Sequence, residues 1–387
     1  MALMGVLLLL IGYFLGLYFF DNAVGGLIIV LAVWGVMNLV ALFQGDNILL
    51  GLSRAKKINR DDNPRLYNIV EEMKIASGLE KMPDIYIIDD PALNAFATGR
   101  DPKKAAIAIT SGLLQKLNRD ELQGVIGHEM AHIKNRDVLL MVMTGILLGT
   151  IVILSWYATR IMFFSGMMGG RRSSSSGSGY GQLIILAVGI ILMILAPIVA
   201  QFIYFAISRK REYLADASSA LYTRYPEGLA SALEKLAIST NQLKSANKAT
   251  APMYIINPFH KKGMSASNIT STHPPISERV RILRSMAGGA SFADYEHSYR
   301  QVHRKGGGII PASAIATSET VELRAAQPEA VPGESDKMKR TRETSELMWR
   351  LNEYKTITCD CGTRLRVPPK FKASKVRCPH CGRINQL

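Results

Sequence analysis

Four apolar runs, each long enough to cross a lipid bilayer, constrain the fold more than any other feature of this chain. Their bounds are Met1 to Phe20, Ala23 to Phe43, Val138 to Phe164 and Leu183 to Ile207. A membrane-spanning helix needs about 20 mainly apolar residues, and inside lipid only helices or closed barrels satisfy the backbone polar groups. The sequence therefore predicts a mainly α integral membrane protein with four transmembrane helices in two hairpins.

Each pair of runs has an alternative interpretation. The first run could be a cleaved signal peptide, but it lacks a basic leading segment and its apolar stretch is too long for one. The runs between residues 138 and 207 could be buried core helices, although their length favours spanning. We therefore expect an uncleaved hairpin over residues 1 to 43 and a second hairpin over residues 138 to 207.

The distribution of positive charge predicts the orientation in the membrane. The formal net charge is +15, and five basic residues closely follow the second run, namely Arg54, Lys56, Lys57, Arg60 and Arg65. By the positive-inside rule, residue 44 onward lies on the cytoplasmic side of the cell membrane. The charge would also suit nucleic acid, but the spans make the lipid bilayer the favoured partner and nucleic acid an unlikely one.

A short motif between the two hairpins indicates metal chemistry. Residues 127 to 132 read Gly-His-Glu-Met-Ala-His at the end of a helix that Asn118 begins. Positions i and i+4 share one face of a helix, so His128 and His132 can bind one metal ion. Glu129 lies beside them, in the position of a general base that takes a proton from the attacking water. Because this motif also arises by chance, the interpretation depends on a third ligand.

Glu212 is the candidate for that ligand. Between Ile133 and Arg211 the only acidic side chain is Asp137, and there is no His or Cys. Glu212 and Asp216 are again i and i+4, so one can bind metal while the other hydrogen-bonds a ligand histidine. A solvated charge at a helix start is the alternative. Glu212 and His132 can share an ion only if an even number of crossings separates them, which fits the second hairpin.

The four cysteines form a separate group near the C-terminus. Cys359 and Cys361 form one pair, and Cys378 and Cys381 form another, each followed by Gly. Two such knuckles predict a zinc ribbon with a structural zinc ion, although Cys-x-Cys departs from the usual spacing. A loose tail with spare thiols is the alternative. The ribbon is basic but lacks the interleaved aromatic residues of a nucleic-acid surface, so its partner remains open.

Several motifs together resemble those of one protein family. They are His128-Glu129-x-x-His132, Asn94-Ala95-Phe96-Ala97-Thr98-Gly99, the segment from Ser208 to Asp216, and Thr272-His273-Pro274-Pro275 with Arg279. Along the chain these motifs resemble the HtpX family of membrane-embedded zinc metalloproteases, which are relatives of the type I CAAX prenyl endoproteases. The resemblance covers roughly residues 1 to 290.

The resemblance implies roles for residues that the motifs alone leave unassigned. It implies a gluzincin-type catalytic domain with a small β-sheet, in which His128, His132 and Glu212 hold the catalytic zinc. It places His273 at the oxyanion and Arg279 against the carboxylates beside the metal, with Asp216 in support. The segment Asn94, Ala95, Phe96 and Ala97 becomes an edge strand to which a substrate peptide adds.

These expectations define an organisation and a function. The predicted units are a transmembrane hairpin (1–43), a cytoplasmic catalytic part (44–137), a second transmembrane hairpin (138–207), a catalytic part with the third ligand (208–290), a linker (291–354) and a zinc-ribbon-like module (355–387). The predicted activity is zinc-dependent cleavage of membrane or misfolded proteins at the cytoplasmic face, in protein quality control and the stress response. The alternatives are a CAAX-type prenyl endoprotease and a non-catalytic membrane adaptor.

Overall fold

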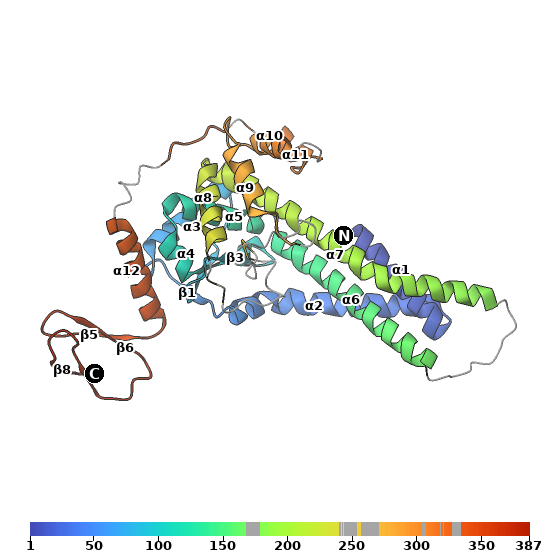
Figure 1. Ribbon diagram of the computed structural model, residues 1–387, viewed down its shortest axis with the longest axis horizontal. Coiled ribbons are helices and arrows are strands. Elements are labelled where there is room, and N and C mark those ends of the chain that lie inside the picture. Colours follow the sequence, from blue (N-terminus) through green and yellow to red (C-terminus); the bar gives the residue numbers. More distant parts are fainter. Residues whose placement is uncertain are drawn as a thin grey trace.

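The computed structural model describes most of the chain. The described residues are 1–167, 179–239, 241, 243, 254–256, 271–303, 307–317, 319, 321–326 and 334–387. Figure 1 shows a bundle of long helices at one end, a central unit of helices and strands, and a small β module at the other end.

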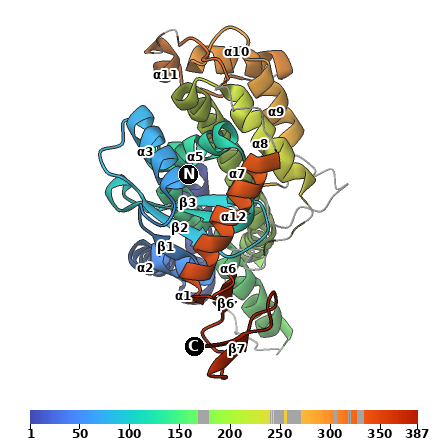
Figure 2. The same ribbon diagram turned by 90° about the vertical axis from the view of Figure 1, so that its left-hand side faces the viewer.

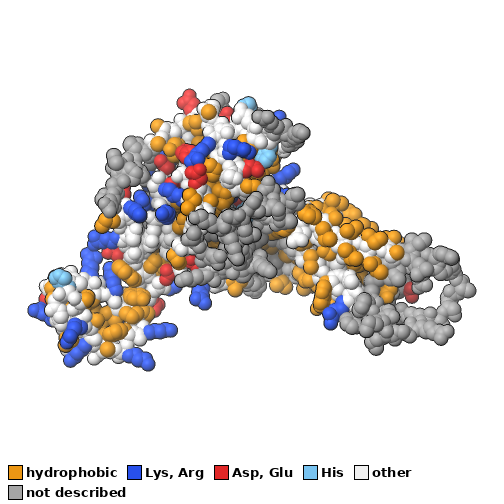
Figure 3. Space-filling model, in the orientation of Figure 1, with side chains coloured by type: hydrophobic (Ala, Val, Ile, Leu, Met, Phe, Trp, Pro, Cys, Tyr) orange, Lys and Arg blue, Asp and Glu red, His pale blue; other side chains and the backbone are white. Residues whose placement is uncertain are grey.

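Four long helices form the bundle. They are α1 (Ala2–Phe20), α2 (Ala23–Leu52), α6 (Asp137–Met167) and α7 (Gly179–Thr223). Each includes a segment long and apolar enough to cross a membrane. Hydrophobic side chains predominate on the face of the bundle that Figure 3 shows, as lipid-facing helices require. The prediction of four transmembrane helices in a mainly α protein is confirmed.

The first hairpin is packed through backbone contact. A Cβ atom added to Gly26 of α2 would lie 2.1 Å from the carbonyl oxygen of Gly12 and 2.4 Å from the amide nitrogen of Gly16, both on α1. Only glycine leaves room for this approach, and small residues are the usual means of close helix packing in membranes. The two helices therefore form a tight pair, and α6 and α7 pack against α1.

A four-stranded sheet lies in the central unit. Its strands are β1 (Lys56–Ile58), β2 (Asp84–Ile88), β3 (Ala95–Thr98) and β4 (Ala106–Thr110), in the order β1-β2-β4-β3. The pair β2–β4 is parallel, and the other two pairs are antiparallel. The strand β3 therefore lies at an edge of this sheet, next to α5.

Helices surround α5 (Arg119–Lys134), which is the centre of this unit. It packs against α3 (Pro64–Ser77), α8 (Pro226–Ile238) and the C-terminal part of α7. The shorter α4 (Ser111–Lys116) follows β4, while α9 (Ile276–Arg284) and α10 (Phe292–Val302) pack on each other beside α8. Two further short helices are η1 (Pro102–Lys104) and α11 (Ala312–Ala316).

Parts of the segment predicted as a linker, residues 291 to 354, pack on the central unit. Tyr295 of α10 is fully buried, and Arg324 donates hydrogen bonds to Asp120 (2.6 Å) and to the carbonyl of Thr223 (2.9 Å). Helix α12 (Glu334–Leu351) lies against α4 and buries Leu347 in the core. The structure thus differs from a free linker, because apolar and paired charged residues hold this segment in place.

The C-terminal module consists of two hairpins. Strand β5 (Lys355–Thr358) pairs with β6 (Arg364–Val367), and β7 (Lys375–Arg377) pairs with β8 (Ile384–Gln386). Figure 2 shows this module directly beyond the end of α12. Arg366 stacks on Trp349 of α12 at 4.5 Å from the ring centroid, so the module also contacts the helix that carries it.

Candidate metal centres

The helix α5 holds the first two candidate ligands. Asn118 and Glu121 form a capping box at its start, as the sequence predicts, and nearly all of its residues are buried. His128 is fully buried and His132 partly so, one turn apart on the same face. Their Nε2 atoms lie 3.1 Å apart, which directs both imidazoles toward one point.

The helix α7 brings Glu212 to that point, although its sequence position is 80 residues away. Its Oε1 lies 3.5 Å from Nε2 of His132, and its Oε2 lies 3.7 Å from Nε2 of His128. Ligands of a tetrahedral zinc ion at about 2.0–2.1 Å are separated by roughly 3.3–3.4 Å. The three ligand atoms therefore fit a zinc ion with a fourth position left over.

Two carboxylates hold the outer nitrogens of the histidines. Asp216 places Oδ1 3.0 Å from Nδ1 of His128, and Asp137 places Oδ2 2.9 Å from Nδ1 of His132. Such contacts fix the tautomer and orientation of a metal-binding imidazole. Asp137 also pairs with Arg211 of α7. Asp137 was not among the residues predicted for the site, although it is the only acidic side chain between Ile133 and Arg211.

Arg279 is buried among these acids. From α9 it donates to both oxygens of Asp216, at 2.7 and 2.8 Å, and lies 3.3 Å from Oε2 of Glu212. It is fully buried, and the adjacent carboxylates hold its pKa above the ordinary value despite that burial. Its guanidinium therefore neutralises two acids that burial would otherwise destabilise.

Glu129 is a buried carboxylate with no hydrogen-bond partner among the described residues. Neither oxygen accepts a hydrogen bond of good geometry, although the backbone amide of Ala97 is near enough to lower the pKa of Glu129, and the side chain is 1% exposed. Burial raises the pKa of Glu129 to about 7. An unpaired buried carboxylate is costly unless something charged or polar meets it, so this residue fits a site that receives a cation and a water molecule.

His273 is close to this cluster, but both of its ring nitrogens have partners within the protein. Nε2 donates a hydrogen bond to the carbonyl of Tyr254 at 2.6 Å, and Nδ1 lies 2.9 Å from Oγ1 of Thr272. In this arrangement Nε2 is directed at the chain's own backbone. A role at an oxyanion requires that hydrogen bond to be released.

The edge strand β3 also has a partner in the chain itself. The amide of Ile255 donates to the carbonyl of Ala95 at 3.0 Å, and Asn94 donates to the carbonyl of Ile256 at 3.3 Å. Phe96 forms a β-bridge with Tyr254, whose ring it also contacts. Residues 254 to 256 thus lie along the outer edge of β3, where a peptide was expected to add. Farther along the strand, Ala97 lines the cavity that His132 and Glu212 share.

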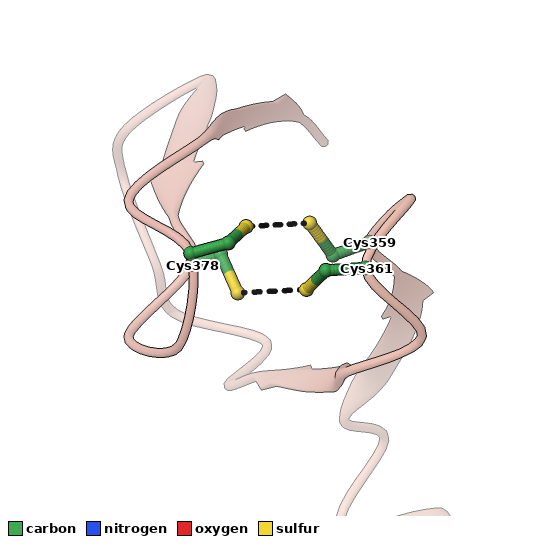
Figure 4. A group of neighbouring side chains, drawn as sticks. Cys359, Cys361 and Cys378 are labelled. Carbon is green, nitrogen blue, oxygen red and sulfur yellow. Dashed lines mark hydrogen bonds between the residues drawn. The ribbon is translucent and has the colours of Figure 1, made fainter.

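The four cysteines form a second cluster in the C-terminal module. The Sγ atoms of Cys359 and Cys381 are 3.6 Å apart, and those of Cys361 and Cys378 are 3.7 Å apart (Figure 4). A tetrahedral zinc ion with Zn–S bonds of about 2.3 Å separates its sulfurs by roughly 3.8 Å. All four atoms are close enough to share one ion despite the short Cys-x-Cys spacing.

Comparisons with known proteins identify a matching family and similar chains. The model of "Peptidase family M48" matches residues 60–287. A "Protease HtpX homolog" of Caldanaerobacter subterraneus is 46% identical over 74% of this chain and 92% of its own length. One of Lactobacillus helveticus is 42% identical over 74% of this chain and 95% of its own length. The crystal structure of S. mikatae Ste24p is similar at a TM-score of 0.41 and 20% identity, over 72% of this chain and 62% of that chain.

The family assignment follows from the sequence comparisons. The matched model covers more than half of the chain, and both HtpX homologues align over nearly their whole length. Four membrane-spanning helices accompany the matched region. The chain therefore belongs to peptidase family M48 and is a multi-pass, membrane-bound metalloendopeptidase of the HtpX type.

Proposed function

We propose that this endopeptidase works with one catalytic zinc ion, held by His128, His132 and Glu212, and carries one structural zinc ion in the C-terminal module, held by the four cysteines. The spacing of the ligand atoms supports both sites. The first set leaves a fourth position open and has an unpaired carboxylate beside it, whereas the second set is complete.

Glu129 acts as the general base. Zinc bound at this site supplies electrophilic assistance to the scissile carbonyl and acidifies water. The carboxylate of Glu129, which has no other hydrogen-bond partner in the described structure, takes a proton from the attacking water and delivers it to the leaving amine. Asp216 and Asp137 keep the two imidazoles in the ligand tautomer, and Arg279 balances the charge of the acids.

A substrate peptide pairs with the outer edge of β3. Residues 254 to 256 occupy part of that edge, so a peptide that pairs along the whole strand has to displace them. Displacement of Tyr254 also breaks its hydrogen bond to Nε2 of His273. That nitrogen is then free to donate to the oxyanion as the tetrahedral intermediate forms.

The active site faces the cytoplasm close to the membrane surface. The basic residues after α2 support this orientation, and both α6 and α7 connect the site directly to their spans. A site at this level suits membrane proteins or misfolded polypeptides as substrates. We assign the enzyme to protein quality control on that basis.

The burial of unpaired Glu129 beside three convergent ligand atoms carries the proposal, and Glu129→Gln tests it. Loss of a general base costs about 10²- to 10⁴-fold in rate. The variant should therefore lose at least that much activity on reduced casein while metal analysis still finds zinc at the site. Glu80→Gln, at an exposed carboxylate, is the matched control and should cleave normally. Substantial turnover by the Glu129 variant would remove Glu129 from this role.

A further inference from the structure

A cavity of about 410 Å³ leads from the metal site into the membrane bundle. At one end it is lined by Ala97, His132 and Glu212. Farther in, the lining comes from three membrane helices, α2, α6 and α7, and consists of Met37, Met141, Val142, Gly145, Ile146 and Tyr204. One cavity thus joins candidate ligand atoms to a mainly apolar interior.

The cavity extends into the level of the apolar spans. The span of α6 begins at Asp137, and Gly145 lies eight residues later, or about 12 Å along the helix. Met37 lies near the end of the α2 span, which runs from Ala23 to Val40. The metal ligands therefore sit at the polar mouth of a pocket whose far end is inside the bilayer.

The charged groups at the mouth are already paired. Asp137 contacts both His132 and Arg211, so neither its carboxylate nor that guanidinium needs a charged ligand. Beyond them the lining offers apolar side chains and one tyrosine. The volume lies in the usual range of ligand pockets, roughly 300–1000 Å³, and an apolar group gains most by filling it.

We propose that this pocket receives a large apolar side chain next to the scissile bond, so that the membrane helices set the cleavage preference. The inference deepens the proposed function and rests on it. Ala97 belongs both to the edge strand and to the pocket lining, so a peptide paired with β3 passes the pocket mouth. Successive side chains of an extended peptide point to opposite faces. Of the two residues that flank the scissile bond, only one can therefore place its side chain in the pocket.

Two glycines one turn apart on α6 give a matched test. A Cβ atom on Gly145 would meet only Cε2 of Tyr204, at 3.7 Å, so the position accepts a side chain, and both Gly145 and Tyr204 line the pocket that this side chain would fill. A Cβ atom on Gly149 meets nothing within 4 Å, and Gly149 does not line the pocket. Gly145→Phe and Gly149→Phe therefore make the same change in helix propensity, while only the first fills the cavity.

The experiment uses the full-length, zinc-loaded protein in lipid nanodiscs. The wild type first cleaves reduced casein, and mass spectrometry of the new termini gives the residues on each side of the cut. Peptides copied from the fastest site, with Leu or Ala at each flanking position, then give the ratio of kcat/KM for Leu over Ala. At one of the two flanking positions, Gly145→Phe should lower this ratio by about tenfold or more. An apolar pocket discriminates between side chains by roughly 10- to 200-fold, so a loss of this size is expected when the pocket is filled. Gly149→Phe should leave it unchanged.

Met141→Ala provides a second variant with the opposite expectation. It enlarges the pocket and should raise the ratio of kcat/KM for Trp over Leu at the same position. Equal Leu/Ala ratios for the Gly145 and Gly149 variants, or a wild type indifferent to both flanking side chains, would overturn the proposal. Sensitivity of these variants to acyl-chain length without any change in side-chain preference would also overturn it, in favour of a lipid tail. Absence of all cleavage by the zinc-loaded wild type would instead refute the proposed function.

Discussion

The two proposed metal centres of this protein are built in opposite ways. The catalytic centre takes ligands from α5 and α7 inside a large core, and Asp137, Asp216 and Arg279 support those ligands. The ribbon centre takes four cysteines from two short hairpins, whose buried cluster is limited to Cys359, Leu365 and Cys378. In the first site the surrounding core positions the ligands, and one coordination position stays open. In the second site the four cysteines fill every coordination position, and two of them form most of the module's small buried cluster.

The two parts therefore differ in how much their folded state depends on bound metal. A small module with so little buried apolar surface depends on metal for its fold. The central unit has a large hydrophobic core without metal, but the charged side chains buried at its metal site lower its stability. Metal binding should therefore fold the ribbon, whereas at the catalytic site it should offset the unfavourable energy of the buried carboxylates.

The largest expected effect separates the two centres. His132→Ala should abolish proteolysis of reduced casein and remove one zinc ion per chain, leaving the ribbon zinc in place. Cys378→Ser, at the buried cysteine of the second knuckle, should remove only the ribbon zinc, unfold β5 to β8 and leave casein cleavage intact. Metal analysis and limited proteolysis check both variants. Loss of both ions from either single variant would mean that the centres depend on each other.

The next effect concerns the supporting charges of the catalytic centre. Arg279→Met leaves the buried Asp216 and Glu212 without their counter-ion, and removal of one partner of a buried pair costs about 3–5 kcal/mol. Arg284→Met is the control, because Arg284 pairs with two exposed acids and should cost no more than about 1 kcal/mol. Unfolding of the metal-free protein in detergent measures both. Equal destabilisation by the two variants would contradict the difference in burial.

A similar effect follows from the pKa of Glu129 in the metal-free protein. Burial raises that pKa to about 7 from the ordinary 4.5, so the folded state binds more protons between these values than the unfolded state. The contribution of Glu129 to the stability of the metal-free central unit should therefore fall as pH rises from 4.5 to 7, by about 3 kcal/mol. Glu129→Gln should remove this fall and stabilise the metal-free protein at pH 8 but not at pH 4. Parallel unfolding curves for the two proteins across this range would show that burial does not raise this pKa.

The smallest effect concerns the carboxylate that orients His132. Asp137→Asn keeps the size of the side chain but weakens the contact with Nδ1 of His132 and the pairing with Arg211. Loss of such an outer contact costs about 10- to 100-fold in metal affinity. Competition with a zinc chelator measures the change, with exposed Asp84→Asn as the control. An unchanged affinity would make Asp137 a structural partner of Arg211 only.

Local sequence patterns predicted much of this structure. The capping box of α5, the four spans and the strands β2 and β4 arise from short-range periodicity and turn chemistry, which a sequence displays directly. The convergence of Glu212 on His128 and His132 was predictable because the spacing left no other candidate. These features need little knowledge of distant contacts.

The features that the sequence did not predict all depend on distant contacts. Asp137 reads as an ordinary acid at a helix start until α5 and α6 are placed together. Leu347 on the charged helix α12 carries no sign that it packs beside α4. Similarly, nothing in Tyr254-Ile255-Ile256 indicates that it pairs with β3, because any extended apolar segment has the same pattern.

The segment along β3 gives the enzyme a built-in competitor. A peptide that uses this edge competes with residues 254 to 256 of the same chain, whose covalent attachment gives them an effective concentration of about millimolar. A soluble polypeptide well below that concentration would displace such a segment less efficiently. A chain anchored in the same bilayer is confined to the same thin layer and reaches a comparable local concentration. If substrate peptides pair with β3 as proposed, this competition favours chains held in the same membrane before any side-chain contact is made.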